Sequence, residues 1–362
     1  MPRESKKILV APLDWGLGHA TRCIPLIRFL LQEGHEVVLG VCAGTSPILQ
    51  HEFPNLPTLK LPGYEVKYSR HKFGFALKLL LQLPRLLRVI REENRILESA
   101  INTLGITHVI SDNRYGLWHS SITSSILCHQ VHLQLPKFGI IEQLINRWHH
   151  RFLNRFDTCF IPDTPQHHYA GALSTPLSGL KNPVWIGPLS RFKPLLETPI
   201  SNEVLILLSG PEPQRNLLET TVLAQWTSTQ LSGVLVRGKA DASDINPIPN
   251  QLRIINLAQT DSLQQLIASS KMVIARSGYS TLMDLAVMNK KALLIPTPGQ
   301  TEQVYLAQWW MQTGFGLSVN QEDLNLKEQI AQVLAMPTPS PMPIQAMFEK
   351  PILEWLNAKP NA

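Results

Sequence analysis

The amino-acid sequence predicts an α/β protein built from two doubly wound parallel-sheet domains. Short apolar strand patterns alternate with amphipathic helix patterns in both halves, which is typical of a parallel sheet covered by helices. A stretch rich in proline, residues 181–203, interrupts this alternation midway. We therefore expect a domain at 1–185, a linker at 186–203, a second domain at 204–340 and a C-terminal helical segment at 341–362 that packs back on the first domain.

The first half supplies the clearest elements. The apolar run Lys7–Pro12 predicts a buried strand. Apolar residues at helical spacing predict a helix over Ala20–Glu33, and Gly34 is expected to end it. Further strands are expected at Glu36–Val41, Thr58–Leu61, His108–Ser111 and Thr158–Ile161.

The second half repeats the same order of elements. Strands are expected at Val204–Leu208, Val234–Arg237, Ile254–Leu257, Met272–Ala275 and Ala292–Ile295. Helices are expected at Arg215–Trp226, Ser262–Ser269, within a loop–helix unit at Arg276–Met288, at Thr301–Thr313 and at Ile344–Leu356. Ligands of such sheets bind at the carboxyl ends of the strands, so the cleft between the two halves is the expected site.

Composition narrows the class of protein. The 362 residues are 44% hydrophobic and 17% charged, which is ordinary for a globular chain. No apolar run approaches the roughly 20 residues that span a bilayer. The four cysteines are scattered without metal-ligand spacing, as suits a reducing cytoplasm. The net charge of +6 comes from residues 1–185, which hold 20 Lys and Arg against 13 Asp and Glu.

The segment after the first strand carries candidate chemistry. Gly16 and Gly18 allow a substrate to approach the backbone, and His19 and Arg22 follow at the start of a helix. A neutral imidazole is available near pH 7, so His19 is the candidate base. Asp14 and Asp112 are reserves that could instead orient His19 or cap a helix.

Two later segments have the character of a phosphate and sugar site. In Arg276–Thr281, hydroxyl and glycine residues open a helix whose free N–H groups can hold a diphosphate, and Arg276 could add charge-assisted bonds or form a structural salt bridge. Asp284 lies one turn further on, where a carboxylate can bind two ribose hydroxyls. The segment Pro296–Gln303 offers Glu302 and Gln303 to sugar hydroxyls, although each of these features also occurs in ordinary capped helices.

Taken in order, these motifs resemble glycosyltransferases of the GT-B fold. The resemblance is to the MurG-like branch, which is related to glycosyltransferase family 28, and to a family of uncharacterised glycosyltransferases with a Gly-x-Gly-His-Ala-Thr-Arg start. Features like Phe156-Asp157…Pro162-Asp163 and Gly187–Arg191 extend it over nearly the whole chain. The resemblance is specific for the fold and for nucleotide-sugar use, and it does not identify the sugar or the acceptor.

The resemblance also implies roles for individual residues. Gly16, Gly18, His19 and Arg22 fall on the acceptor and phosphate loop of the first domain. The donor-binding positions are Ser209, Gly210, Arg276, Ser277, Gly278, Ser280, Thr281, Asp284, Gln300, Glu302 and Gln303. Two departures stand out: Pro211-Glu212-Pro213 replaces a freer glycine-rich turn, and Asp284 stands where the family usually has Glu.

We therefore expect transfer of a hexosyl group, such as N-acetylglucosamine, from a nucleotide diphosphate sugar to an acceptor hydroxyl. A UDP-sugar is the expected co-substrate, inversion is implied by the relatives, and no metal or further cofactor is expected. One alternative is a nucleotide-sugar hydrolase of the pseudaminic-acid-pathway type, in which His19 activates water. Another is a non-catalytic nucleotide-binding protein.

The acceptor is open between a sugar, a lipid-linked and a small-molecule compound. Basic residues beside apolar ones in 67–95 and 147–155 would suit contact with an anionic membrane by a cytoplasmic protein, although a core-packing stripe with a solvated basic face explains them as well. Pro84 is expected to break the helix in the first of these segments. No nucleic-acid-binding module is recognisable, so nucleic acid is not an expected partner.

Overall fold

The computed structural model describes residues 5–14, 17–43, 45–64, 75–133, 139–166, 168–195, 198–210, 212–239, 251–341 and 348–358, and side chains are not described at 75–82 and 139–141. The chain divides into two compact units, Met1–Leu189 with Ile344–Ala362, and Ser190–Pro343. Gly16 and residues 67–74 belong to predicted sites but lie outside the described residues.

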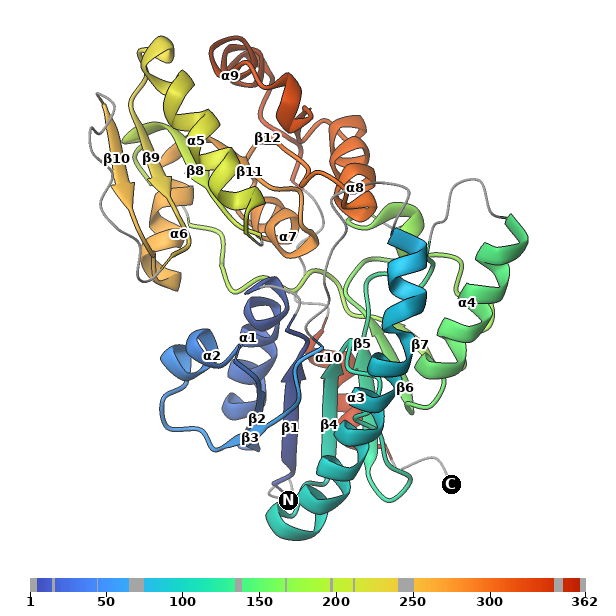
Figure 1. Cartoon of the computed structure of the whole chain (residues 1–362). Coiled ribbons are helices and arrows are strands. Elements are labelled where there is room, and N and C mark those ends of the chain that lie inside the picture. The colour runs from blue at the N-terminus through green and yellow to red at the C-terminus, as the bar shows by residue number, and fades with distance from the viewer. Residues whose placement is uncertain are drawn as a thin grey trace. The chain divides into compact units, whose positions relative to one another are not determined.

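The first unit contains a seven-stranded parallel sheet (Figure 1). Its strand order is β3-β2-β1-β4-β5-β6-β7, so the order reverses between β1 and β4. The strands are Lys7–Pro12 (β1), Glu36–Val41 (β2), Thr58–Lys60 (β3), His108–Asp112 (β4), Thr123–Leu127 (β5), Thr158–Ile161 (β6) and Pro183–Trp185 (β7). The helices are Leu17–Gln32 (α1), Ser46–Glu52 (α2), Phe75–Leu104 (α3), Gly139–Leu153 (α4) and Glu349–Leu356 (α10).

Helices cover both faces of this sheet, because alternate residues of each strand point to opposite sides. On one face, Leu97 and Ala100 of α3 pack with Leu9 and Val109. On the other face, the ring of Trp355 in α10 lies edge-on to the ring of His108, with the centroids 5.2 Å apart. The C-terminal helix is therefore part of the first unit.

The second unit repeats the plan with a six-stranded parallel sheet of order β10-β9-β8-β11-β12-β13. The reversal here falls between β8 and β11. The strands are Asn202–Leu207 (β8), Gly233–Val236 (β9), Leu252–Ile255 (β10), Ser270–Ala275 (β11), Ala292–Leu294 (β12) and Gly316–Ser318 (β13). The helices are Gln214–Trp226 (α5), Thr260–Ala268 (α6), Tyr279–Val287 (α7), Thr301–Gln312 (α8) and Leu326–Ala335 (α9).

The prediction of two doubly wound parallel sheets is confirmed, since every described strand pair is parallel. The predicted break at Pro84 is wrong, because α3 continues from Phe75 to Leu104. Pro84 is exposed in this helix. The segment 181–203 is also not wholly irregular, because Pro183–Trp185 forms β7 at the edge of the sheet.

Candidate functional site

The order reversal in the first sheet brings together His19, the candidate base, and Asp112, one of its two reserves. Pro12 at the end of β1 is in register with Asp112 at the end of β4, and the N–H of Leu13 donates to the Asp112 carbonyl at 3.0 Å. Helix α1 then begins at Leu17, which places His19 in its first turn. Ligands of open α/β sheets bind at such a reversal, so this strand edge is a candidate site.

His19 and Asp112 form a direct pair. The Nδ1 atom of His19 lies 3.0 Å from Oδ2 of Asp112, whose side chain is fully buried, while the His19 side chain is 14% exposed. Although burial alone would raise the pKa of the Asp112 carboxyl, Arg22 and His19 hold it well below its usual range. Asp112 is therefore ionised and serves as a partner of His19, whereas His19 is the group that solvent reaches.

Arg22 and Asp14 have structural partners. The guanidinium of Arg22 binds both carboxylate oxygens of Asp112, with Nε donating to Oδ2 at 2.8 Å, and the residue is 2% exposed. The resemblance places Arg22 on an acceptor and phosphate loop, and in the structure its described contacts are with protein side chains. The carboxylate of Asp14 accepts the N–H of Tyr64 at 3.0 Å and so fixes the loop after β1.

In the second unit, three loops converge at the carboxyl ends of β8, β11 and β12. The hydroxyl of Ser277 donates to the Gln303 carbonyl at 2.7 Å, and the side-chain oxygen of Gln303 accepts the N–H of Thr297 at 2.8 Å. A Cβ atom added to Gly210 would lie 3.8 Å from Oγ1 of Thr297. The loops that carry Ser209, Arg276–Thr281 and Gln300–Gln303 thus meet, as the sequence order suggested.

The start of α7 lies at this meeting point. Gly278 precedes the helix and has no side chain that could cap it, and a Cβ atom there would lie 3.9 Å from the amide nitrogen of Gln303. Ser280 and Thr281 are half-buried in the first turn. The dipole of a helix start favours an anion such as a phosphate.

Arg276 holds these loops together and is only 1% exposed. Its Nη1 donates to the carbonyls of Ile295 at 3.2 Å and Pro296 at 3.1 Å, and its Nη2 donates to the Gln214 carbonyl at 2.8 Å and to the side chain of Gln321 at 2.6 Å. Burial lowers its pKa to about 10. The guanidinium remains charged at neutral pH. The described contacts of Arg276 hold the loops together, and they are neither the diphosphate contact nor the salt bridge that the sequence suggested.

Asp284 lies on α7, one turn beyond Ser280. Its carboxylate accepts the hydroxyl of Ser190, and the residue is half-buried. Burial raises its pKa to about 6, although Arg191 and Ser190 favour the ionised form. One oxygen is thus engaged by Ser190. Gln300 precedes α8, and Glu302 and Gln303 lie half-buried in its first turn.

Sequence reasoning missed two residues of these sites. His129 follows β5, is 5% exposed, and its Nδ1 lies 3.0 Å from Nη1 of Arg22. Thr297 is 2% exposed and its hydroxyl has no partner among the described residues. No clear sequence signal marked His129, because the strand before it, Thr123–Leu127, lacks an apolar run.

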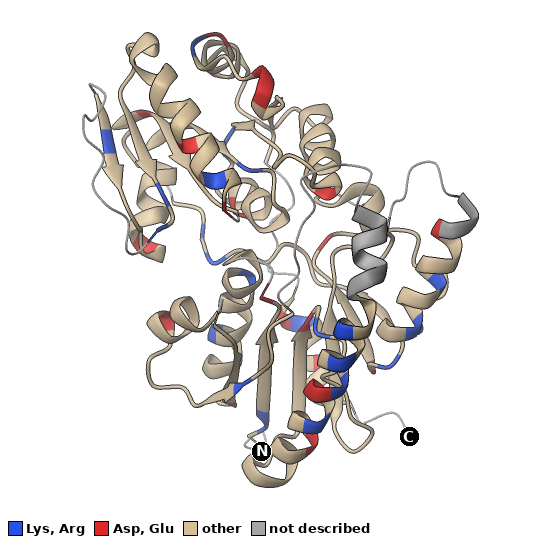
Figure 2. Cartoon of the chain, viewed as in Figure 1, with Lys and Arg blue, Asp and Glu red and all other residues tan. Residues whose placement is uncertain are grey.

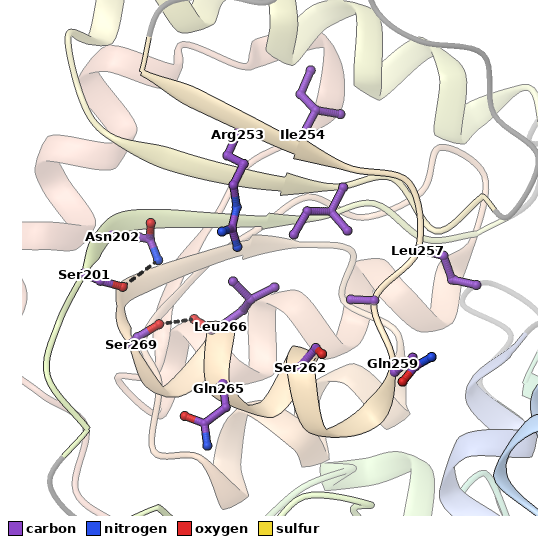
Figure 3. A pocket seen from close by; sticks show the side chains of 12 residues that line it. Ser201, Asn202, Arg253, Ile254, Leu257, Gln259, Ser262, Gln265, Leu266 and Ser269 are labelled. Atoms are coloured by element: carbon purple, nitrogen blue, oxygen red, sulfur yellow. Dashed lines mark hydrogen bonds between the residues drawn. The ribbon is translucent and has the colours of Figure 1, made fainter.

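A separate open pocket of about 930 Å³ lies between β10 and α6 (Figure 3). Arg253, Asn202 and Gln265 are among the side chains that line it. It shares no residue with the predicted donor set. The pocket is therefore not the predicted donor site, and it provides a contrast for ligand-binding experiments.

Comparisons with known proteins indicate the class of protein and its fold. Residues 214–354 match the glycosyltransferase family 28 C-terminal domain. An uncharacterized glycosyltransferase of Methanopyrus kandleri is 26% identical over 327 residues, which cover 85% of this chain and 90% of the relative. A UDP-N-acetylglucosamine–N-acetylmuramyl-(pentapeptide) pyrophosphoryl-undecaprenol N-acetylglucosamine transferase of Sulfurihydrogenibium is 23% identical over 168 residues, 46% of each chain.

A solved structure extends the likeness to both units. Spinosyn rhamnosyltransferase SpnG complexed with thymidine diphosphate has a TM-score of 0.60 at 16% identity and covers 96% of this chain and 95% of its own. The names of these proteins favour transfer over hydrolysis. Together, the family match, the relatives and the two parallel sheets show that the protein is a glycosyltransferase with the GT-B fold that resembles the MurG-like enzymes.

Proposed function

We propose that the protein transfers a hexosyl group of the N-acetylglucosamine type from a UDP-sugar to an acceptor hydroxyl, with inversion at the anomeric carbon. The supporting observation is the convergence of three loops around the start of α7, where the dipole of the helix would attract a diphosphate. The names of two similar proteins, one complexed with thymidine diphosphate and one a UDP-N-acetylglucosamine transferase, support the choice of donor.

In the proposed reaction, Nε2 of His19 takes the proton of the acceptor hydroxyl while the hydroxyl oxygen attacks the anomeric carbon. Asp112 accepts the Nδ1–H of His19 and thereby fixes the tautomer in which Nε2 is free. The bond from the sugar to the diphosphate breaks, and the N-terminal end of α7 stabilises the leaving charge without a bound metal ion.

Thermal unfolding in the presence of nucleotides tests the donor class. Saturation with UDP at about 100 times its Kd should stabilise the folded protein by about 2.7 kcal/mol and raise Tm. Inorganic phosphate at the same concentration is the control, because it lacks the nucleoside. If Tm is the same with UDP, TDP, ADP and GDP as with phosphate, the protein does not bind a nucleotide donor.

Asp284 predicts how donor binding depends on pH. An ionised carboxylate accepts bonds from ribose hydroxyls, and the pKa of Asp284 is about 6. We expect the Kd for a UDP-sugar to rise below pH 6, by at most about tenfold per pH unit. Calorimetric titration with a UDP-sugar is suitable because its two phosphates do not titrate in this range.

The matched control is Asp284→Asn, which should bind more weakly at pH 7.5 and show a flat profile between pH 5 and 7.5. Loss of the folded state cannot cause the weaker binding at low pH. The pKa of Asp284 is higher in the folded than in the unfolded protein, so its protonation as the pH falls through 6 stabilises the folded protein. Equal pH profiles of the wild type and the variant would remove Asp284 from the donor site.

We further propose that the protein works in the cytoplasm, in peripheral contact with an anionic membrane and on a lipid-linked acceptor. Its four cysteines are free, as suits a reducing compartment. Leu144 and Trp148 of α4 are 59% and 46% exposed, and Arg147 and Arg151 are exposed on the same helix. Helix α3 also carries basic residues, coloured blue in Figure 2, together with acidic residues, coloured red. Among the helices that the structure describes, none is long and apolar enough to cross a membrane.

Co-sedimentation with vesicles tests this contact. The protein should pellet with vesicles that contain phosphatidylglycerol, and Trp148→Glu should weaken the binding because it removes an apolar anchor and adds a negative charge. The control is Leu217→Glu, which changes a 50% exposed leucine on α5 of the second unit. Equal pelleting of both variants would argue against a membrane role for α4.

A further inference from the structure

The His19–Asp112 pair has a third member, because Arg22 lies against both side chains. On α1, Arg22 is one turn after His19, so the two side chains share a face of the helix. The guanidinium binds both oxygens of Asp112, and its Nη2 lies 2.9 Å from Nδ1 of His19. Its Nη1 lies 3.0 Å from Nδ1 of His129. All four side chains meet at the ends of β4, β5 and α1.

Arg22 and Asp112 are both buried, so Arg22 acts on the side chains next to it. The side chains of Arg22 and Asp112 are 1% and 0% exposed. A bidentate contact of this kind fixes the plane of the carboxylate as well as neutralising its charge. The guanidinium also lies against two imidazole nitrogens. Nδ1 of His129 can accept a hydrogen bond from it when that nitrogen is unprotonated, whereas Nδ1 of His19 donates its proton to Asp112 and meets Arg22 as a neighbouring positive charge.

The charged and titratable groups that face His19 determine how easily it takes a proton. They are Asp112 on β4, Arg22 on α1 and His129 after β5, and the thiol of Cys23 lies 3.9 Å from Oδ2 of Asp112. A carboxylate without a cation would favour imidazolium and would keep His19 protonated near neutral pH. Burial lowers the pKa of His19, and Arg22 adds to this effect while Asp112 opposes it.

We propose that Arg22 is a positioning residue for His19: it neutralises Asp112 and holds its carboxylate in place, so that His19 stays uncharged at neutral pH and can accept a proton. This inference rests on the proposed role of His19 as the base. This positioning role adds to the place on the acceptor and phosphate loop that the resemblance implies for Arg22. It also gives the Arg of the Gly-x-Gly-His-Ala-Thr-Arg start a function that depends on its spacing of three residues from the His.

The test measures His19 directly by NMR of protein labelled with ¹⁵N-histidine, titrated between pH 5 and 9. The chain has 12 histidines, so the His19 signals are assigned by their loss in His19→Gln. In Arg22→Met, the pKa of His19 should rise by about one unit or more, because Asp112 becomes an unneutralised anion beside it. In Arg22→Lys, which keeps the charge without the planar fork, the pKa should stay close to the wild-type value.

The matched control is Arg28→Met, because Arg28 lies on the same helix but pairs with Glu52. If Arg22→Met leaves the pKa of His19 where Arg28→Met leaves it, the proposal is overturned. If Arg22→Met does not fold, the wild-type protein keeps the proposal falsifiable: a His19 pKa below 7 supports an uncharged His19 at neutral pH, and a value of 7 or above overturns the proposal.

Activity provides an independent reading. Once a donor and an acceptor are known, the acid limb of the kcat/KM profile should move to higher pH in Arg22→Met together with the pKa of His19. A shifted pKa with no glycosyl transfer in the wild type would sustain the role of Arg22 and contradict the proposed function. Glycosyl transfer by the wild type, together with an unshifted His19 pKa in Arg22→Met, would support the proposed function and contradict the role of Arg22.

Discussion

Replacing His19 with Ala is expected to lower turnover by about 100- to 10,000-fold, the usual contribution of a general base. Nδ1 of His19 lies against Asp112, and the residue retains some exposure, so Nε2 is the nitrogen available to an acceptor hydroxyl. Binding of a UDP-sugar should remain close to normal, since the predicted donor residues belong to the second unit. Release of UDP and calorimetric binding measure the two effects separately.

The control is His119→Ala. His119 follows β4 in the same unit, but its Nδ1 bonds the Ser121 hydroxyl at 2.8 Å in an exposed turn. This variant should keep normal turnover. A His19→Ala protein with turnover near that of His119→Ala would exclude His19 as the base.

Replacing Arg114 with Met is expected to destabilise the protein by about 3–5 kcal/mol, because it leaves a buried carboxylate without its cation. Arg114 and Glu93 are fully buried, with Nη1 of Arg114 2.8 Å from Oε1 of Glu93. Nε of Arg114 donates to the Pro12 carbonyl at 2.8 Å, and the Tyr64 hydroxyl donates to Glu93 at 2.8 Å. This network ties the end of β1, and hence the loop before His19, to α3.

Urea unfolding followed by circular dichroism measures this effect. The control is Lys350→Met, whose partner Glu354 is also exposed, so that its effect should stay within about 1 kcal/mol. Adding Glu93→Gln to Arg114→Met should recover part of the loss, since the unpaired charge is then removed. A loss for Arg114→Met as small as that of the control would show that the network contributes little to stability.

The elements that the sequence missed have identifiable reasons. The strand Thr123–Leu127 contains two serines and a threonine, so it lacks an apolar run, yet it is fully buried because groups such as the Ser125 hydroxyl bond neighbouring carbonyls. The strand Pro183–Trp185 lies in a proline-rich segment, and an edge strand tolerates proline. The helix Leu326–Ala335 carried a usable signal, because Asn325 precedes it and its side chain caps the helix by accepting the N–H of Glu328.

The candidate sites could be predicted only in part. Strand–loop–helix patterns located the loops, because the ends of parallel strands gather at one sheet edge. The sequence named Asp112 as a reserve base or an orienting group, and the structure supports the second reading, since Arg22 and His19 surround it. The burial of Arg22 and Arg276 depends on partners about 90 and 45 residues away, such as Asp112 and Gln321, which local patterns cannot pair.

The donor-binding role of the three loops in the second unit is tested most directly by a crystal structure of the protein with UDP. The diphosphate should lie at the start of α7, within hydrogen-bond distance of the N–H groups of residues 278–281, with the ribose at Asp284. A diphosphate bound elsewhere, for example beside Arg253 in the pocket between β10 and α6, with these loops empty, would contradict the proposed donor site.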